Sequence, residues 1–131
     1  LGRPASGEVF ADGAIRQDFE IWVDGVPLLL ERNRFDAHAE LLKAGWGLSG
    51  LCSLASIIAY PCEAHLVEAA RAVCGRFSDQ HAAATAVDGA LVGRIISADM
   101  RYIRAWLNEL WSALRPRLLG RPAVAPRIWA T

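Results

Sequence analysis

The stretch IRQDFEIWVDGVPLLLERNRF, residues 15–35, decides the fold of the amino-terminal part of the chain. Apolar and polar residues alternate on both sides of Asp24-Gly25, and Asp-Gly between strand-like runs is a strong signal for a β-hairpin. We therefore predict two antiparallel strands joined by a two-residue turn. Counting outward from the turn predicts four cross-strand pairs: Val23 with Val26, Ile21 with Leu28, Phe19 with Leu30, and Asp18 with Glu31.

Successive side chains of a strand point to opposite faces, so this register divides the hairpin into an apolar and a polar face. The apolar face, a candidate core face, holds Ile15, Phe19, Ile21, Val23, Val26, Leu28 and Leu30. The polar face holds Asp18, Glu20, Glu31, Trp22 and Leu29. Neighbouring carboxylates raise one another's pKa and attract a divalent cation, whereas the simpler interpretation is a solvated polar face. The two large apolar residues indicate that part of this face is covered.

The middle of the chain predicts a strand, a helix and a second hairpin. LCSLASIIAY, residues 51–60, has the character of a strand, and Pro61 ends it. CEAHLVEAARAVCG, residues 62–75, has apolar residues at helical spacing, and Gly75 is its predicted C-cap. Residues 81–87 and 90–97 flank Asp88-Gly89, which predicts another hairpin.

The longest predicted helix follows, with Ser97 as its expected N-terminal cap. Pro116 is expected to end or kink this helix, because proline lacks the backbone donor and clashes with the preceding turn. Its apolar stripe has the 3-4 spacing of an amphipathic helix: Met100, Ile103, Trp106, Leu107, Leu110, Trp111 and Leu114. An extended C-terminal tail completes a predicted α+β, β-rich chain with the element order β-β-β-α-β-β-α.

Composition places the chain among globular proteins. It has 131 residues, of which 53% are hydrophobic and 21% charged, and its net charge is zero. These values argue against disorder and support a single domain. No apolar run reaches the 18 or so residues of a membrane span, and no signal peptide is visible, although the chain also lacks an initiator methionine. We expect a cytoplasmic protein without a membrane partner, whose three cysteines, Cys52, Cys62 and Cys74, are reduced and buried.

The charges divide into an acidic head, within residues 1–43, and a basic tail, within residues 100–131. Arg115, Arg121 and Arg127 could contact a partner, but stacking aromatics interleaved with these bases, as in nucleic-acid modules, are not visible. The simpler interpretation is a structural strap anchored by Ile128 and Trp129. Cys62 and His65 could share a metal, but a structural cysteine and a surface histidine are favoured. The sequence shows neither a nucleophile elbow nor a phosphate loop, so we predict no enzyme activity and no catalytic residue.

Several motifs in order resemble one known family, the urease accessory protein UreD, also called UreH. They are LGRPASGEVF, EIWVDGVPLLLER, an apolar strand ending in AYP, a helix ending in LWSALRP, and the terminal LLGRPAVAPRIWAT. Family members are about twice as long, so residues 1–131 are expected to be the C-terminal portion of a UreD-like protein. Within it, residues 1–43 would form an acidic hairpin region, and residues 44–131 the strand-helix-hairpin-helix-tail region.

The resemblance implies a non-enzymatic scaffold that helps nickel reach apo-urease together with UreF-like and UreG-like accessory proteins. It also implies a layered, β-helical body and no tightly bound cofactor. Family acids are thought to line a transient nickel route, and Glu8, Glu20 and Glu31 fall in the matching stretches. Asp18 stands where the family tends to have a basic residue and would join them. The alternatives are a protein-interaction module without a metal role and an inactive, truncated family member.

Overall fold

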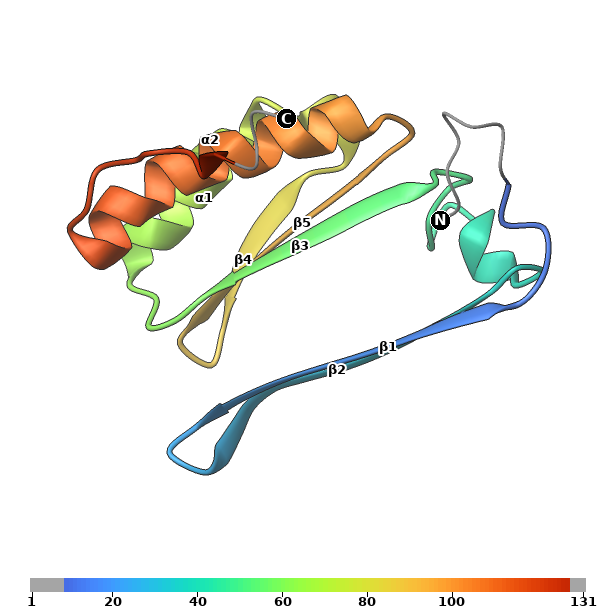
Figure 1. Ribbon diagram of the computed structural model, residues 1–131, viewed down its shortest axis with the longest axis horizontal. Helices are drawn as coiled ribbons and strands as arrows, with labels where there is room; N and C mark the ends of the chain where they lie inside the picture. The colour runs from blue at the N-terminus through green and yellow to red at the C-terminus, as the bar shows by residue number, and fades with distance from the viewer. Residues whose placement is uncertain (1–8, 128–131) are drawn as a thin grey trace. The chain divides into compact units, whose positions relative to one another are not determined.

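The computed structural model describes residues 9–127 and divides after Cys52 into two compact units (Figure 1). Unit 1 contains a two-stranded sheet, and unit 2 contains a three-stranded sheet and two α-helices. The predicted α+β class and the order β-β-β-α-β-β-α are confirmed. That residues 1–131 form a single domain stays a prediction. No helix within residues 9–127 combines the length and the apolar character needed to cross a membrane.

Unit 1 is built on the predicted hairpin, whose strands are β1 (Ala14–Val23) and β2 (Val26–Asp36). Asp24 and Gly25 have positive φ angles of 50° and 78°, the backbone that a two-residue type I′ turn requires. Val23 pairs with Val26, as predicted. A short 3-10 helix, η2 (Glu40–Leu42), follows the hairpin.

The register predicted farther from the turn is wrong, because a β-bulge shifts β2 by one residue. Trp22 pairs with Pro27, but Ile21 then pairs with Leu29, which leaves Leu28 as the extra residue. Phe19 consequently pairs with Glu31 rather than Leu30, and Asp18 with Arg32 rather than Glu31. Proline cannot donate to the ladder, and within sheets it is confined to edges, strand starts and bulges, which accounts for the irregularity beside Pro27.

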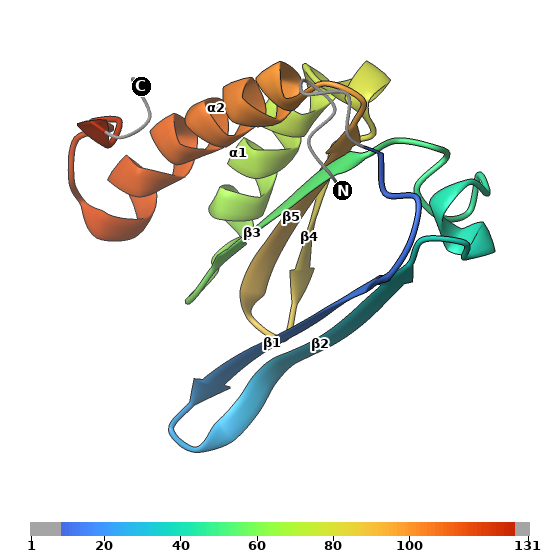
Figure 2. The same cartoon turned by 45° about the vertical axis from the view of Figure 1, so that its right-hand side comes forward.

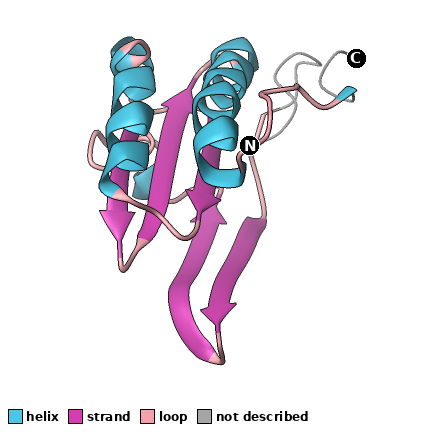
Figure 3. Cartoon of the chain, turned by 90° about the vertical axis from the view of Figure 1, so that its left-hand side faces the viewer, coloured by secondary structure: helices cyan, strands magenta, loops and turns pink. Residues whose placement is uncertain are grey.

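Unit 2 is an antiparallel sheet in the order β3-β5-β4, formed by β3 (Ser53–Ala59), β4 (Ala83–Val87) and β5 (Ala90–Ser97). The second predicted hairpin is confirmed, with Val87 opposite Ala90. Helices α1 (Ala64–Gly75) and α2 (Met100–Leu119) lie side by side over one face of this sheet (Figures 2 and 3). A second 3-10 helix, η3 (Ser78–Gln80), connects α1 to β4.

The core of unit 2 lies between the helices and the sheet. Its fully buried large side chains are Trp106, Leu91, Ile95, Ile103 and Leu110. The α1 residues of the same cluster are Leu66, Val67, Ala70, Val73 and Cys74. Of the three cysteines, all free thiols, only Cys74 is fully buried, and Cys52 and Cys62 are half-buried.

The ends of the helices differ from the sequence predictions in three places. Ser97 is not the cap of α2, because Asp99 takes that position and accepts the Arg101 N–H at 2.8 Å. Pro116 does not end α2, which continues to Leu119, and the Pro116 carbonyl still accepts the N–H of the left-handed C-cap Gly120 at 3.0 Å. Proline lacks only its own backbone N–H, so the other hydrogen bonds of the last turn can still form. Helix α1 includes Gly75 and is capped one residue later, at Arg76.

Candidate functional site

The polar face of the hairpin carries the most chemistry in unit 1. Its β1 side chains alternate along the strand, and Arg32 reaches them from β2 because it lies directly opposite Asp18. The Arg32 guanidinium contacts the Glu20 carboxylate at 2.5 Å and the Asp18 carboxylate at 3.9 Å. Arg16 binds Asp18 from the same strand at 2.9 Å. Two carboxylates thus share one arginine on an exposed surface.

Glu20 is held from two sides. The Trp22 indole donates its Nε1–H to Glu20 Oε2 at 2.9 Å, while Arg32 donates to the other carboxylate oxygen. These bonds, the indole first and the guanidinium second, keep the pKa of Glu20 below its ordinary value. Glu20 is therefore ionised at neutral pH. Trp22 itself remains 53% exposed.

A second pair on the same face stands farther from the turn. Arg34 binds Asp36 through both Nε and Nη2, with N–O distances between 2.9 and 3.2 Å. These hydrogen bonds hold the pKa of Asp36 below its ordinary value. The face therefore balances acids against arginines: Asp18, Glu20 and Asp36 against Arg16, Arg32 and Arg34.

The predicted patch of three neighbouring carboxylates does not form, because Glu31 lies on the other face. The bulge places Glu31 opposite Phe19, where its Oε1 accepts the Asn33 side-chain N–H at 2.7 Å. Arg32 occupies the place that the unbroken register gave to Glu31, so the face is charge-balanced rather than acidic. Pro27, two residues beyond the turn, is the sequence signal that could have revealed the shift.

Within residues 9–127, no three His, Cys, Asp or Glu side chains come together in a way that could hold a metal ion. Of the predicted nickel-route residues, Glu8 lies outside the described part of the chain. His65 Nδ1 lies 3.3 Å from Glu63 Oε2, and the Cys62 thiol faces the Glu63 carbonyl oxygen at 3.5 Å. Burial, reinforced by the Glu63 charge, raises the pKa of Cys62, which disfavours the thiolate that a metal would need.

The tail residues singled out from the sequence fall into three situations. Arg115 stacks over the Trp111 ring, 4.8 Å from its centroid. Arg121 and Arg127 are exposed. Trp129 lies outside the described residues, so its role as an anchor stays a prediction. A described contact does hold the tail: the Trp111 Nε1–H donates to the Val124 carbonyl oxygen at 3.1 Å.

Comparison with known proteins identifies the family. The family model described as UreD urease accessory protein matches residues 1–130. Among proteins named urease accessory protein UreD, that of Pseudomonas paraeruginosa is 42% identical, that of Pseudomonas fluorescens 39% and that of Dechloromonas aromatica 37%. Each alignment covers the whole of this chain but only 46%, 46% and 47% of the respective relative.

The chain therefore belongs to the UreD urease accessory protein family, and the resemblance read from its sequence is confirmed. It spans about half the length of the curated relatives that it matches.

Proposed function

We propose that this chain acts in urease maturation as a non-catalytic, cytoplasmic scaffold that works with apo-urease and with UreF-like and UreG-like accessory proteins. The observation that carries the proposal is the family match over residues 1–130. The named relatives, urease accessory proteins from several bacteria, support the same role. Because the chain spans about half of these relatives, we assign to it a share of the scaffold rather than the whole.

Within this role, we propose that nickel passes transiently along the polar face of the hairpin. Asp18 and Glu20 supply oxygen ligands, which bind nickel without a full cage and so release it readily. Arg32 already binds both carboxylates, so a nickel ion would have to displace its guanidinium group from them. Glu8 and Glu31 belong to the same proposed route on the family resemblance alone, and Glu31 lies on the opposite face of the hairpin.

A complementation experiment tests both levels of the proposal. Cells with the urease genes and every accessory gene except the one for UreD receive this chain, and urease activity is measured at low and high nickel. We expect the chain to raise activity above the level without it. We expect Asp18→Asn/Glu20→Gln to lose most of that gain at low nickel and to recover at high nickel, because excess metal compensates for weaker capture.

The matched control is Asp36→Asn, which removes a carboxylate from the same face but leaves the contacts of Arg32 with Asp18 and Glu20 intact. This variant should behave like the unmodified chain at both nickel concentrations. No activation by the unmodified chain would overturn the scaffold proposal and favour an inactive, truncated family member. Full activation by the double variant at low nickel would overturn the nickel route alone.

Exposed apolar surface favours a second candidate, a docking module without a metal role. Trp22 and Leu30 lie on the polar face and are 53% and 52% exposed, beside balanced charges that suit a protein partner. In that case Trp22→Ala would lose activation at both nickel concentrations, whereas the carboxylate variant would keep it. The two candidates thus predict opposite results in the same assay.

A further inference from the structure

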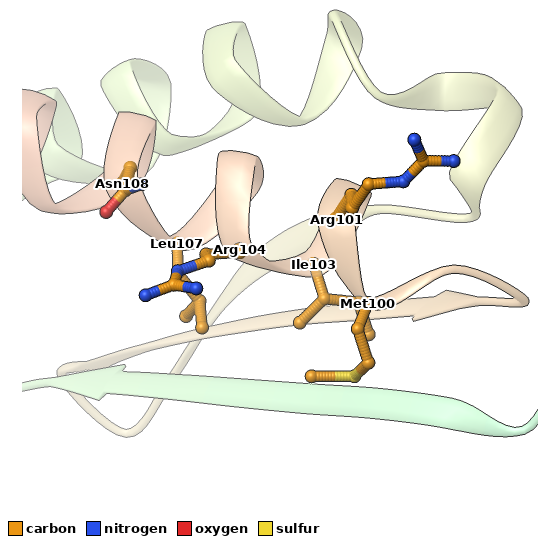
Figure 4. Close-up of a pocket in the computed structure, with 6 residues that line it drawn as sticks. All are labelled: Met100, Arg101, Ile103, Arg104, Leu107 and Asn108. Atoms are coloured by element: carbon orange, nitrogen blue, oxygen red, sulfur yellow. The ribbon is translucent and has the colours of Figure 1, made fainter. Parts of the chain in front are cut away.

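The longer helix of unit 2, α2, has a groove of about 370 Å³ on its surface. The residues that line this α2 groove are Met100, Arg101, Ile103, Arg104, Leu107 and Asn108. Figure 4 shows the side chains of Met100, Ile103 and Leu107 extending from the same side of the helix. Met100 is 58% exposed, and Leu107 is half-buried. The α2 groove therefore presents apolar side chains to its occupant.

The groove belongs to a longer row of large side chains on α2, the outer strip, which consists of Met100, Leu107 and Trp111. Leu107 lies seven residues after Met100 and four before Trp111, and this spacing places all three on one side of the helix. The Trp111 indole donates its Nε1–H to the Val124 carbonyl oxygen at 3.1 Å, and the Arg115 guanidinium lies over its ring. The tail thus contacts the outer strip at Trp111, and the α2 groove forms the N-terminal part of the strip.

The tail leads from the end of α2 back toward the groove. Helix α2 ends at Leu119, and Gly120, with a φ of 60°, ends the helix in a left-handed backbone. Val124 then contacts Trp111, which lies eight residues, or about 12 Å, before the end of the helix. Figure 1 shows the described tail running back alongside α2 toward its N-terminal end. The residues after Val124 therefore start about one helical turn from the α2 groove.

The described tail buries little of its own surface. Residues 119–125 are all exposed. The Val124 side chain is 66% exposed, so the bond to Trp111 holds the backbone of the tail without burying an apolar side chain. The next large apolar residues in the sequence are Ile128 and Trp129, which lie outside the described part of the chain. They have the most apolar surface to bury in this segment.

The distances allow these two side chains to reach the groove. Trp129 follows Val124 by five residues, which span at most about 17 Å of extended chain. Along the helix axis, Leu107 lies about 6 Å from Trp111, and Met100 lies about 16 Å from it. An indole ring also makes a favourable contact with a methionine thioether. The whole α2 groove is therefore within reach of the tail.

We propose that Ile128 and Trp129 fold back along α2 and bind in the α2 groove, with their side chains against Met100 and Leu107. The tail then covers the outer strip from Trp111 to the start of the helix. In this position the tail is the groove's own occupant, and another protein could bind there only after displacing it. The inference rests on the geometry of unit 2 and neither on the nickel route nor on a role in urease maturation.

The only methionine of the sequence, Met100, provides a specific probe of the groove. When the chain is labelled with carbon-13 at the methionine methyl group, NMR gives a single signal from this position. We expect a nuclear Overhauser effect between this methyl group and the Trp129 indole, and a shifted methyl signal in Trp129→Leu, because the ring current is lost. The control is Trp46→Leu, which removes an indole that is 72% exposed and should leave the signal unchanged.

The same spectra decide between occupants. Absence of the nuclear Overhauser effect, or an unchanged methyl signal in Trp129→Leu, would overturn the proposal. The signal should also be independent of protein concentration. A shift that develops with concentration, or a nuclear Overhauser effect between labelled and unlabelled copies in a mixed sample, would identify a second copy as the occupant and would overturn the proposal as well.

Thermal unfolding tests whether the tail and the groove stabilise each other. Trp129→Ala and Leu107→Ala should each lower the unfolding midpoint, the first by at least about 4 °C, because a buried indole is lost. The double variant should lose clearly less than the sum, since both single variants remove the same contact. Far-ultraviolet circular dichroism checks that each variant is folded.

Val124→Ala is the matched control in the tail. It truncates an exposed side chain but keeps the carbonyl group that binds Trp111, so it should change the midpoint little. Additive losses in the double variant would mean that Trp129 packs elsewhere, and an unchanged midpoint in Trp129→Ala would mean that it is not bound. Either result would overturn the proposal.

Discussion

Replacing Gly93 with alanine should destabilise unit 2, because the centre of β5 has no room for a side chain. A Cβ at this position would lie 2.9 Å from Ile57 Cγ2 and 3.3 Å from Trp106 Cζ2. The Ile57 methyl is attached directly to its β-carbon and cannot move far without the backbone, and Trp106 is fully buried. Overpacking of this kind costs about 1–3 kcal/mol.

A smaller opposing effect reduces this cost. Alanine restricts the unfolded chain more than glycine does, which is worth about 0.4–1 kcal/mol in favour of folding. We therefore expect Gly93→Ala to lower the free energy of unfolding by about 1–2 kcal/mol. In a domain of this size, each kcal/mol corresponds to a fall of about 4–8 °C in the midpoint of thermal unfolding.

Thermal and urea unfolding followed by helical circular dichroism will measure this effect, since both α-helices belong to unit 2. Gly75→Ala is the matched control, because a Cβ there meets nothing within 4 Å and the site lies at the end of α1. In an Ile57→Ala background the cost of Gly93→Ala should shrink, as the nearest clash is gone. Equal stabilities of the Gly93→Ala and Gly75→Ala variants would refute the packing argument.

Three further predictions concern a turn, a cap and a carboxylate. Gly89→Ala should destabilise unit 2 by about 1–2 kcal/mol in urea unfolding, because Gly89 has a φ of 79°. Asp99→Ala should lower the thermal midpoint more than Asp79→Ala does, since only Asp99 caps α2. Glu20 has a lowered folded pKa, so its stabilising contribution is present above the unfolded pKa and is lost as pH falls through the folded value. The loss of hairpin stability at acid pH, followed by the backbone chemical shifts of residues 14–36, should therefore be smaller in Glu20→Gln.

Local signals in the sequence predicted both hairpins, because a two-residue turn with positive φ at both positions strongly favours Asp-Gly. Asp24-Gly25 and Asp88-Gly89 both adopt this backbone. The pairing next to each turn followed directly. The register farther along β2 depends on a single bulge. Alternation of apolar and polar residues does not show where a strand has one extra, unpaired residue. The bulge places Glu31 on the opposite face from the predicted one and puts Arg32 in its place. The predicted acidic patch is therefore a charge-balanced one.

Helix ends show a different limit of sequence reasoning. Ser97 and Asp99 are both good capping residues, and the choice between them depends on tertiary packing. Ser97 is buried at the end of β5, and its hydroxyl donates to the side-chain oxygen of Gln80 in η3 at 2.7 Å. Pro116 lies in the last turn of α2 and does not end the helix, since a proline there removes only one donor. Met100 fits the apolar periodicity of α2 but is 58% exposed. Periodicity does not show which part of a helix the sheet covers.

The bulge on β2 also has a genetic consequence. Leu28 is the only residue of β2 without a partner on β1. It lies between Pro27, which pairs with Trp22, and Leu29, which pairs with Ile21. Deleting the Leu28 codon would make these two pairs consecutive on both strands. Every pair beyond them would then keep its partner and its face, so the hairpin can lose one residue here without exchanging its inside and its outside.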